Sequence, residues 1–300
     1  MWVSDKWTDF ELLDASRDGT GDGSAREGMR LERWGRYVLE RPDPQVIWDT
    51  GRNHPRWRNP DAVYRRSATG GGAWSEHRLP ASWTVSYGDL TFAVKPMNFK
   101  HTGLFPEQAV NWDAARGLIQ KRAQSDHPVK LLNLFAYTGA ATVACAKAGA
   151  AVTHVDAAKG MVAWAKENTA LNQVEARWIV EDCRRFLERE LRRGNMYDAV
   201  IMDPPSYGRG PGGEIWKLED DVFSFLRSIT GLLSDNPLFV FVNAYTTGLA
   251  PGVLTYMLDS LIAARFGGKA ESRELGLPVA GTPADMRLFL PCGATGRWIR

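Results

Sequence analysis

The sequence has no long apolar run and only a few scattered cysteines. No window approaches the ~18 consecutive apolar residues of a membrane-spanning helix. The segment Met1–Trp7 lacks the basic-then-apolar order of a signal peptide. Cys145, Cys183 and Cys292 are far apart and form no C-x-x-C pair, which argues against a disulfide framework or a zinc site. We therefore expect a cytoplasmic protein with no membrane anchor and no bound metal.

A strong charge of one sign is also lacking. The 37 Lys and Arg residues nearly balance 35 Asp and Glu residues, and the pI of about 8.4 does not by itself indicate a nucleic-acid partner. One segment is more suggestive, because between Arg52 and Arg66 five arginines alternate with Trp57 and Tyr64. Arginine and aromatic side chains suit phosphates and exposed bases. The alternative is a solvated loop in an arginine-rich protein, and the pattern alone leaves both open.

Two regions of the chain differ in amino-acid composition and in hydrophobic pattern. Residues 1–95 are rich in Trp, Gly, Pro and Arg, and short alternating runs at 37–40 and 83–87 predict strands. We expect a small β-rich N-terminal domain there that contributes to substrate binding. Residues 96–125 are expected to form a connecting active-site loop and helix, and residues 126–300 a catalytic, cofactor-binding domain.

From about Lys130 onward, apolar strand patterns alternate with helical ones. Such alternation implies right-handed crossovers and a mainly parallel sheet, so the predicted fold class is α/β with a Rossmann-like sheet. Near the end, Glu271–Leu277 and Met286–Leu290 predict a hairpin that places an antiparallel strand last in the sheet. The predicted strands are 129–135, 151–155, 176–180, 197–202 and 238–242, and the predicted helices 140–148, 159–172 and 184–193.

Candidate ligands for a cofactor follow four of the predicted strands. In open α/β sheets, the ligand lies beyond the carboxyl ends of the strands. The residues at those ends are Phe135, Tyr137, Thr138 and Gly139 after the first strand, Asp156 and Ala157 after the second, Asp182 and Cys183 after the third, and Asp203 after the fourth.

The turn after the first strand lacks the features of a phosphate-binding loop. Only Gly139 is present where a dinucleotide fold would have G-x-G-x-x-G, and there is no P-loop lysine. S-adenosylmethionine carries no phosphate and therefore fits. Asp156, 17 residues after Gly139, is near the interval at which an acid reaches ribose hydroxyls. Asp182 could accept from the adenine amino group while the Cys183 amide donates to a ring nitrogen, although each acid taken alone could equally be a helix N-cap.

These motifs closely resemble the bacterial class I methyltransferase family that includes large-subunit ribosomal RNA methyltransferases. The resemblance covers roughly residues 80 to 290 and implies the fold, S-adenosylmethionine as cofactor, and cofactor contacts at Phe135, Tyr137, Gly139, Asp156 and Asp182. It also marks 99–108 as a loop entering the active site, with His101, Phe105 and Gln108 as candidate substrate contacts. The matching stretches are 99–108, 131–139, Val155-Asp156, Asn168, Leu171-Asn172, 203–211 and 213–218.

The loop after the fourth strand is the candidate methyl-acceptor site. In Asp203-Pro204-Pro205-Ser206-Tyr207, the two prolines stiffen the backbone and leave carbonyls to accept from an amine, Asp203 can accept too, and Tyr207 could stack on a base. The alternative is an ordinary rigid turn. Residues 208–213 are glycine-rich and predict a lid, with Arg209 as a further substrate candidate, and Trp216 is either a substrate platform or a core anchor.

The positions of the cysteines bear on the chemistry. Some related RNA methyltransferases attack cytosine with a cysteine that follows strand four or five. In this sequence the corresponding stretches are residues 204–207 and 243–246, and neither contains cysteine. We therefore expect direct in-line transfer to a base nitrogen or exocyclic amine of RNA, with ribosomal RNA as the first hypothesis. A small-molecule or protein methyltransferase is the alternative.

Overall fold

The computed structural model describes residues 1–17, 27–67, 71–75, 77–122, 128–209, 213, 215–246, 248–282 and 286–300. The chain divides into two compact units. Unit 1 comprises Met1–Trp2, Val110–Leu275 and Gly293–Arg300, and unit 2 comprises Val3–Ala109 and Gly276–Cys292.

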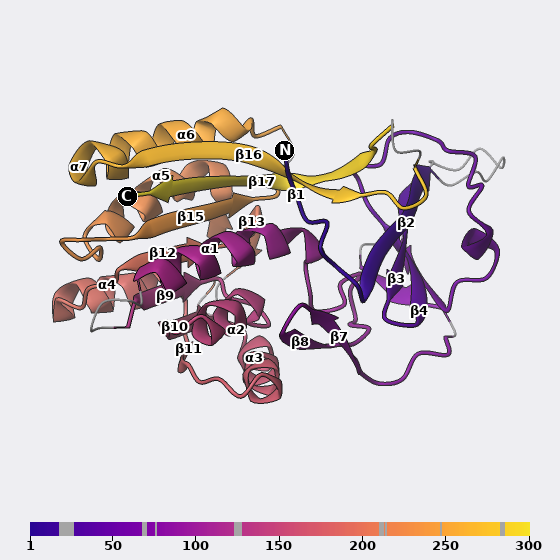
Figure 1. Ribbon diagram of the computed structural model, residues 1–300, viewed down its shortest axis with the longest axis horizontal. Helices are drawn as coiled ribbons and strands as arrows, with labels where there is room; N and C mark the ends of the chain where they lie inside the picture. The colour runs from indigo at the N-terminus through magenta and orange to yellow at the C-terminus, as the bar shows by residue number, and fades with distance from the viewer. Residues whose placement is uncertain are drawn as a thin grey trace. The chain divides into compact units, whose positions relative to one another are not determined.

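Unit 1 is built on an eight-stranded sheet in the order β1-β16-β17-β15-β12-β9-β10-β11 (Figure 1). The strands β9, β10, β11, β12 and β15 are parallel, while β17 is antiparallel to β15. This confirms the predicted Rossmann-like class with its antiparallel last strand. The strands are β1 (Trp2–Val3), β9 (Lys130–Leu134), β10 (Ala151–Asp156), β11 (Arg177–Val180), β12 (Ala199–Met202), β15 (Phe239–Ala244), β16 (Lys269–Pro278) and β17 (Phe289–Ile299).

Helices cover both faces of this sheet because its central strands are apolar on both sides. Alternate residues of β12 point to opposite faces: Val200 and Met202 pack with α4, α5 and α6, whereas Ala199 and Ile201 pack with α1 and α2. The helical segments are α1 (Ala109–Arg122), α2 (Ala140–Lys147), α3 (Lys159–Leu171), α4 (Cys183–Arg193), α5 (Leu218–Thr230), α6 (Pro251–Leu258), the π-helix η3 (Asp259–Ala263) and α7 (Ala264–Phe266). A small hairpin, β13 (Tyr207–Arg209) with β14 (Ile215–Lys217), lies between β12 and α5 in sequence.

The last strand begins and ends later than the sequence predicted. Met286–Leu290 was expected to be the antiparallel strand, but residues 294–299 of β17 make the pairing with β15. Two glycines interrupt the apolar pattern here, and each has a packing reason. A Cβ on Gly296 would lie 2.8 Å from the Leu254 Cβ, and one on Gly293 would lie 2.7 Å from the Ala244 carbonyl. Cys292 is a buried residue within β17.

Unit 2 is β-rich. Its five-stranded sheet has the order β2-β3-β4-β5-β6, and β7 and β8 form a separate hairpin. Its elements are β2 (Phe10–Arg17), β3 (Gly28–Trp34), β4 (Tyr37–Pro42), the 3₁₀ helix η1 (Pro55–Arg58), β5 (Ala62–Arg66), β6 (Gly72–Trp74), β7 (Trp83–Tyr87), β8 (Leu90–Val94) and the 3₁₀ helix η2 (Pro106–Gln108).

The two units differ from the segments 1–95, 96–125 and 126–300: Met1–Trp2 groups with unit 1, the segment 96–125 divides at Val110, and Gly276–Cys292 groups with unit 2. Helix α1 groups with the sheet of unit 1, because Ile119 is buried in its core and the Asn111 amide donates to Asn243 and Thr295. Residues Gly276–Cys292 group with unit 2, where the Ala280 amide donates to the Leu12 carbonyl at 2.8 Å. Long-range contacts of this kind leave no local signature in the sequence.

Candidate active site

The turn after β9 lies at the carboxyl edge of the parallel sheet, and four of its backbone amides are already hydrogen-bonded within the protein. The amide of Phe135 donates to the Cys183 sulfur at 3.4 Å, and that of Tyr137 donates to Asp156 Oδ2 at 2.8 Å. The amides of Ala136 and Gly139 donate to the carbonyls of Val155 and Ala136. A phosphate-binding loop needs such amides free. The turn therefore fits a cofactor without phosphate, as the sequence predicted.

Three residues of this turn have left-handed backbone conformations. The φ angles are 53° at Phe135, 51° at Tyr137 and 80° at Gly139. For the two aromatic residues this conformation costs on the order of 1–3 kcal/mol each, and such strain clusters at ligand-binding sites. Gly139 is also the N-cap of α2, and a Cβ there would lie 2.8 Å from the Ala165 Cβ on α3. Close packing of α3 and the positive φ together require glycine.

Asp156 is held in place at the end of β10. Its Oδ2 accepts from Tyr137 and its Oδ1 accepts from the Ala158 amide at 2.8 Å. Burial raises the pKa of this half-buried carboxyl, and the two amide bonds lower it. Each oxygen retains further acceptor capacity, which is what two ribose hydroxyls require. The next residue, Ala157, is exposed.

Asp182 is the N-cap of α4, which is the alternative that the sequence left open. Its Oδ1 accepts from the amides of Arg184 and Arg185 at 2.9 and 3.2 Å. Among the described residues Oδ2 makes no hydrogen bond, so the predicted adenine contact through this oxygen stays a prediction. Cys183 is the first residue of α4, so its amide has no partner within the helix, and its buried side chain supports the Phe135 turn.

Polar side chains with no predicted role support the turn from the adjoining helices and strands. The Asn168 amide of α3 donates to the Thr138 carbonyl at 2.8 Å, which explains the asparagine in the matched motif. The Thr142 hydroxyl lies between the Asn133 amide and His154 Nδ1, at 2.9 and 3.0 Å. A buried histidine in a strand was the available signal, but the sequence alone does not reveal which turn it supports.

The loop after β12, the predicted methyl-acceptor site, differs from the prediction in one respect. Pro204 is buried and Pro205 is exposed. Carbonyls of this loop were expected to be available to an amine, but that of Pro205 accepts from the Trp216 indole at 2.7 Å. Asp203 lies half-buried directly at the end of β12. The carbonyl of Ser206 accepts from Leu218, which ties the loop to α5.

Trp216 is a core residue, which answers the choice that the sequence left open. Its side chain is only 7% exposed. The ring lies 5.1 Å from that of Phe135 and 5.4 Å from that of Phe225, so it links the cofactor turn to α5. A substrate platform would need an exposed ring face, and the exposed aromatic residue of this loop is Tyr207, at 52%.

Tyr207 begins the β13–β14 hairpin. Its hydroxyl accepts from Arg209 Nε at 3.2 Å, so the two predicted substrate residues lie together on an exposed strand. The predicted lid is centred on residues 210–212, which lie outside the described residues.

The predicted substrate loop of unit 2 is more buried than expected. His101 and Phe105 are half-buried, with ring centroids 5.5 Å apart, and Gln108 is buried. Burial and the nearby charges of Arg41, Lys100 and Arg30 lower the pKa of His101 to about 3. Its imidazole is therefore neutral and a weak base at neutral pH. A neutral, weakly basic imidazole is suited to a binding contact rather than to proton abstraction.

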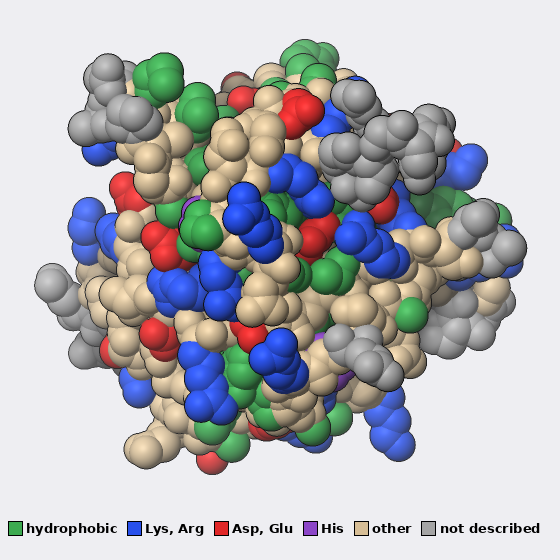
Figure 2. Space-filling view, turned by 90° about the vertical axis from the view of Figure 1, so that its right-hand side faces the viewer, with side chains coloured by type: hydrophobic (Ala, Val, Ile, Leu, Met, Phe, Trp, Pro, Cys, Tyr) green, Lys and Arg blue, Asp and Glu red, His purple; other side chains and the backbone are tan. Residues whose placement is uncertain are grey.

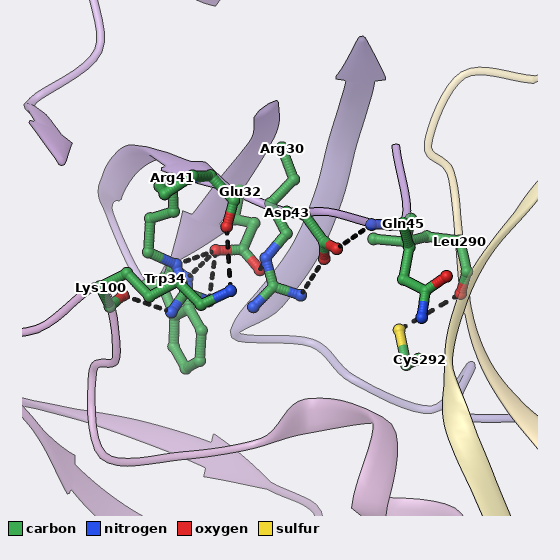
Figure 3. A network of polar contacts seen from close by, with 10 residues as sticks. Arg30, Glu32, Trp34, Arg41, Asp43, Gln45, Lys100, Leu290 and Cys292 are labelled. Atoms are coloured by element: carbon green, nitrogen blue, oxygen red, sulfur yellow. Dashed lines mark hydrogen bonds and ion pairs between the residues drawn. The ribbon is translucent and has the colours of Figure 1, made fainter. Parts of the chain in front are cut away.

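A buried cluster of charged side chains, unforeseen from the sequence, holds this loop (Figure 3). Glu32 is fully buried, accepts hydrogen bonds from Arg41 and the Trp34 indole, and forms an ion pair with Arg30. Arg41 also donates to the Lys100 carbonyl at 2.8 Å. Strand residues at 30, 32 and 41 would ordinarily face solvent, and only their tertiary pairing allows such charges to be buried.

The Arg52–Arg66 segment is not the open basic and aromatic surface that was considered. Trp57 and Tyr64 are 8% and 3% exposed, so neither ring can stack on a base. Four of its arginines form ion pairs with carboxylates of the same unit: Arg52 and Arg65 with Glu40, Arg56 with Asp61, and Arg66 with Glu27. Hydrophobic packing and internal pairing thus account for most of the pattern.

Two further observations concern the described part of the chain. None of its helices combines the length and apolarity needed to span a bilayer. Within the same residues, no group of three or more His, Cys, Asp or Glu side chains is placed to hold a metal ion.

A mainly parallel sheet with an antiparallel last strand, a turn with four bonded amides and an acid after the second strand together indicate an α/β S-adenosylmethionine-binding enzyme. The comparisons agree. Residues 60–252 match the family model described as S-adenosylmethionine-dependent methyltransferase, and the chain belongs to this family. It is therefore an S-adenosylmethionine-dependent methyltransferase, as the sequence predicted.

A solved structure and curated relatives are similar over different lengths. The crystal structure of the SAM-dependent methyltransferase from Agrobacterium tumefaciens is 34% identical, with a TM-score of 0.85 over 99% of this chain and 92% of that one. The ribosomal RNA large subunit methyltransferases K/L of Pseudoalteromonas atlantica and Syntrophotalea carbinolica are 35% and 30% identical. These matches cover 51% and 60% of this chain but only 21% and 25% of the relatives, so the chain spans about a quarter of their length.

Proposed function

We propose that this methyltransferase modifies ribosomal RNA of the large subunit, by direct in-line transfer to a base nitrogen or an exocyclic amine. The observation that carries the proposal is the loop after β12, where the half-buried Asp203 precedes the Pro204-Pro205 turn and the exposed Tyr207 ring follows it. The names of the curated relatives support RNA as the substrate class.

The residues of this chain act mainly by orientation. Bound S-adenosylmethionine supplies an electrophilic methyl group. Phe135, Tyr137, Thr138 and Gly139 with Asp156, Ala157, Asp182 and Cys183 would hold it at the carboxyl edge of the sheet. Asp203 would accept a hydrogen bond from the acceptor amine while Tyr207 stacks on the base. Orientation of this kind can lower a barrier by roughly 7–11 kcal/mol.

The burial of every cysteine supports transfer without a covalent adduct. Cys145, Cys183 and Cys292 are all buried and reduced. Burial raises the pKa of the Cys145 thiol to about 12 and raises the pKa of Cys183 and Cys292 as well. Since the thiolate is the nucleophilic form, none of the three is suited to attack a pyrimidine.

The surface charge fits RNA contacts made by separate cations. Figure 2 shows the face of the molecule that lies on the right in Figure 1, where Lys and Arg side chains are spread among Asp, Glu and apolar side chains. The affinity for RNA should therefore fall with added salt, and the steepness of the fall should be set by the number of phosphates contacted.

A small-molecule or protein substrate is the second candidate, and one observation favours it. Unit 2 contains a mainly apolar cavity of about 700 Å³, which is large enough for a small molecule. Affinity for RNA that falls steeply with salt would argue against this candidate.

The direct test is mass spectrometry of ribosomal RNA nucleosides from a strain lacking the gene. We expect one methylated nucleoside to disappear, and the purified chain with S-adenosylmethionine to restore it on RNA from that strain. The Tyr207→Ala variant is the control, and it should restore the methylated nucleoside poorly if the loop after β12 binds the acceptor base. An unchanged set of modified nucleosides would remove ribosomal RNA as the substrate.

A further inference from the structure

The cavity of unit 2 has walls from three separate segments. Strand β2 contributes Leu13 and Asp14, the segment before η1 contributes Trp48 and His54, and the tip of the β16–β17 hairpin contributes Val279 and Leu288. The register of β2 against β3 shifts between Leu12 and Asp14. A bulge of this kind redirects side chains, and here the residues that line the cavity lie at the shift.

Two residues that line this cavity are large, exposed apolar side chains, and two more such side chains lie near them in the sequence. Trp48 and Leu288 line it and are 36% and 50% exposed, and their sequence neighbours Ile47 and Met286 are 68% and 56% exposed. Exposed apolar groups that gather around a hollow mark a binding surface more often than isolated ones do. The Trp48 indole donates to the Ala15 carbonyl at 2.7 Å, which fixes the ring as one wall.

The polar end of the cavity offers one donor and one acceptor. His54 Nδ1 accepts from the Arg56 amide, so in the neutral ring Nε2 carries the proton and can donate. The Asn53 amide nitrogen donates to the Thr50 carbonyl, which leaves its oxygen as an acceptor. Asp14 is already used, since its carboxylate accepts from Thr50 and the Trp57 indole. A flat ligand with a donor and an acceptor on one edge would match this end.

Two exposed arginines lie close in sequence to residues that line the cavity. Arg58 ends η1, which His54 caps, and Arg287 directly precedes Leu288. Both side chains are exposed, and within the described part of the chain neither forms an ion pair. They differ in this from Arg52, Arg56, Arg65 and Arg66, which are paired internally.

We propose that this cavity binds one unpaired nucleobase of the RNA substrate, other than the base that is methylated, with the neighbouring phosphates at Arg58 and Arg287. The inference rests on the proposed RNA substrate. The apolar walls receive the base, the His54 and Asn53 groups read its edge, and the volume of about 700 Å³ admits the attached ribose. An apolar side chain of a protein partner would use neither the polar edge nor the two cations.

The first test is photo-crosslinking of the full chain to substrate RNA carrying 5-iodouridine, followed by peptide mapping. We expect crosslinked peptides containing Trp48, His54 or Phe289. Crosslinks confined to residues outside the cavity lining would overturn the inference.

The second test separates this site from the reaction. Leu288→Glu changes an exposed residue and should leave the fold intact, whereas Trp48→Ala removes a wall. Both variants should raise the KM for RNA roughly tenfold, because one base stack is lost. Their kcat and affinity for S-adenosylmethionine should stay unchanged. The matched control is Tyr256→Ala on α6, an aromatic side chain that is 72% exposed and does not line the cavity.

The outcomes distinguish this inference from the proposed function. If the wild type methylates no RNA, both fail. If it methylates RNA and the two variants keep the wild-type KM, only this inference fails. If Leu288→Glu instead converts a dimer into a monomer in sedimentation without changing that KM, the cavity is covered by a second copy of the chain and the inference is again overturned.

Discussion

The carboxylate of Asp156 accepts the backbone amide of Tyr137 at 2.8 Å, so the end of β10 is bonded directly to the turn that follows β9. This hydrogen bond stabilises a residue with a φ of 51° and, together with the bond from the Ala158 amide, fixes the orientation of the acid. The strained turn and the proposed ribose contact therefore depend on the same side chain.

Replacing Asp156 should impair cofactor binding more than any surface change. Asp156→Ala removes charged hydrogen bonds worth on the order of 1.5–3 kcal/mol each, so calorimetry should show S-adenosylmethionine bound more than tenfold more weakly. Asp259→Ala, at an exposed aspartate of η3, is the control and should bind normally. Unchanged affinity in Asp156→Ala would contradict the assignment.

Replacing Tyr207 should separate the acceptor side from the cofactor side. Tyr207→Ala should reduce turnover with little change in cofactor affinity, because the ring is exposed and lies beyond the cofactor turn. Tyr207→Phe keeps the stacking surface and should retain most of the rate. Steady-state kinetics with calorimetry check this, and equal losses in both variants would point to the hydroxyl instead.

The cysteines should be dispensable for chemistry. Cys183→Ser keeps a side chain that can accept from Phe135, and Cys145→Ala and Cys292→Ala remove buried thiols. We expect each variant that folds to keep its kcat within about threefold, since no thiolate takes part. Complete loss of turnover in one folded variant would indicate a covalent route.

Gly139 should be less tolerant of substitution than Gly149. Both have a positive φ, but a Cβ at Gly139 meets Ala165 at 2.8 Å, whereas one at Gly149 meets nothing within 4 Å. Both substitutions strain the backbone, but Gly139→Ala also overpacks the contact with α3. It should therefore lower the free energy of unfolding by on the order of 1–3 kcal/mol more than Gly149→Ala. Urea denaturation of the two variants measures the difference, and equal losses would show that α3 shifts freely.

The stability of the protein should depend on pH through Glu107. Burial raises the pKa of Glu107 from its ordinary value of 4.5 to about 7, although the positive charge of Arg30 lowers it. Because the folded-state pKa is the higher one, this contribution is present below about pH 4.5 and is lost as the pH rises through about 7. Between those values the wild type should lose on the order of 2–3 kcal/mol relative to Glu107→Gln.

Denaturant titrations of both proteins at about pH 5 and about pH 8 measure this effect. Lys100 and His101, whose pKa values are also shifted, are present in both and cancel in the comparison. Identical pH dependence of the two proteins would show that the Glu107 carboxyl is not perturbed.

The catalytic sheet could be predicted from the sequence because its signals are local. Parallel strands buried on both faces give apolar runs, and their carboxyl ends must share one edge, so the turn at Phe135 and Asp156 followed from spacing alone. The position of β17 was missed because Gly293 and Gly296 resemble a break until the helix and the backbone packed against them are known.

The features that could not be predicted from the sequence depend on contacts between residues far apart in the chain. Trp57 and Tyr64 had the composition of a nucleic-acid-binding surface, yet they are buried and their neighbouring arginines are neutralised by Glu40 and Asp61. The cavity of unit 2 joins residues near 14, 50 and 280, and no local pattern relates segments so far apart.

The most direct test of the account is a crystal structure of the chain with S-adenosylhomocysteine. The account predicts both ribose hydroxyls within about 3 Å of the Asp156 carboxylate, with the sulfur directed toward Asp203 and Tyr207. A ligand bound away from the carboxyl edge of β9 and β10, or a ribose that does not contact Asp156, would contradict it.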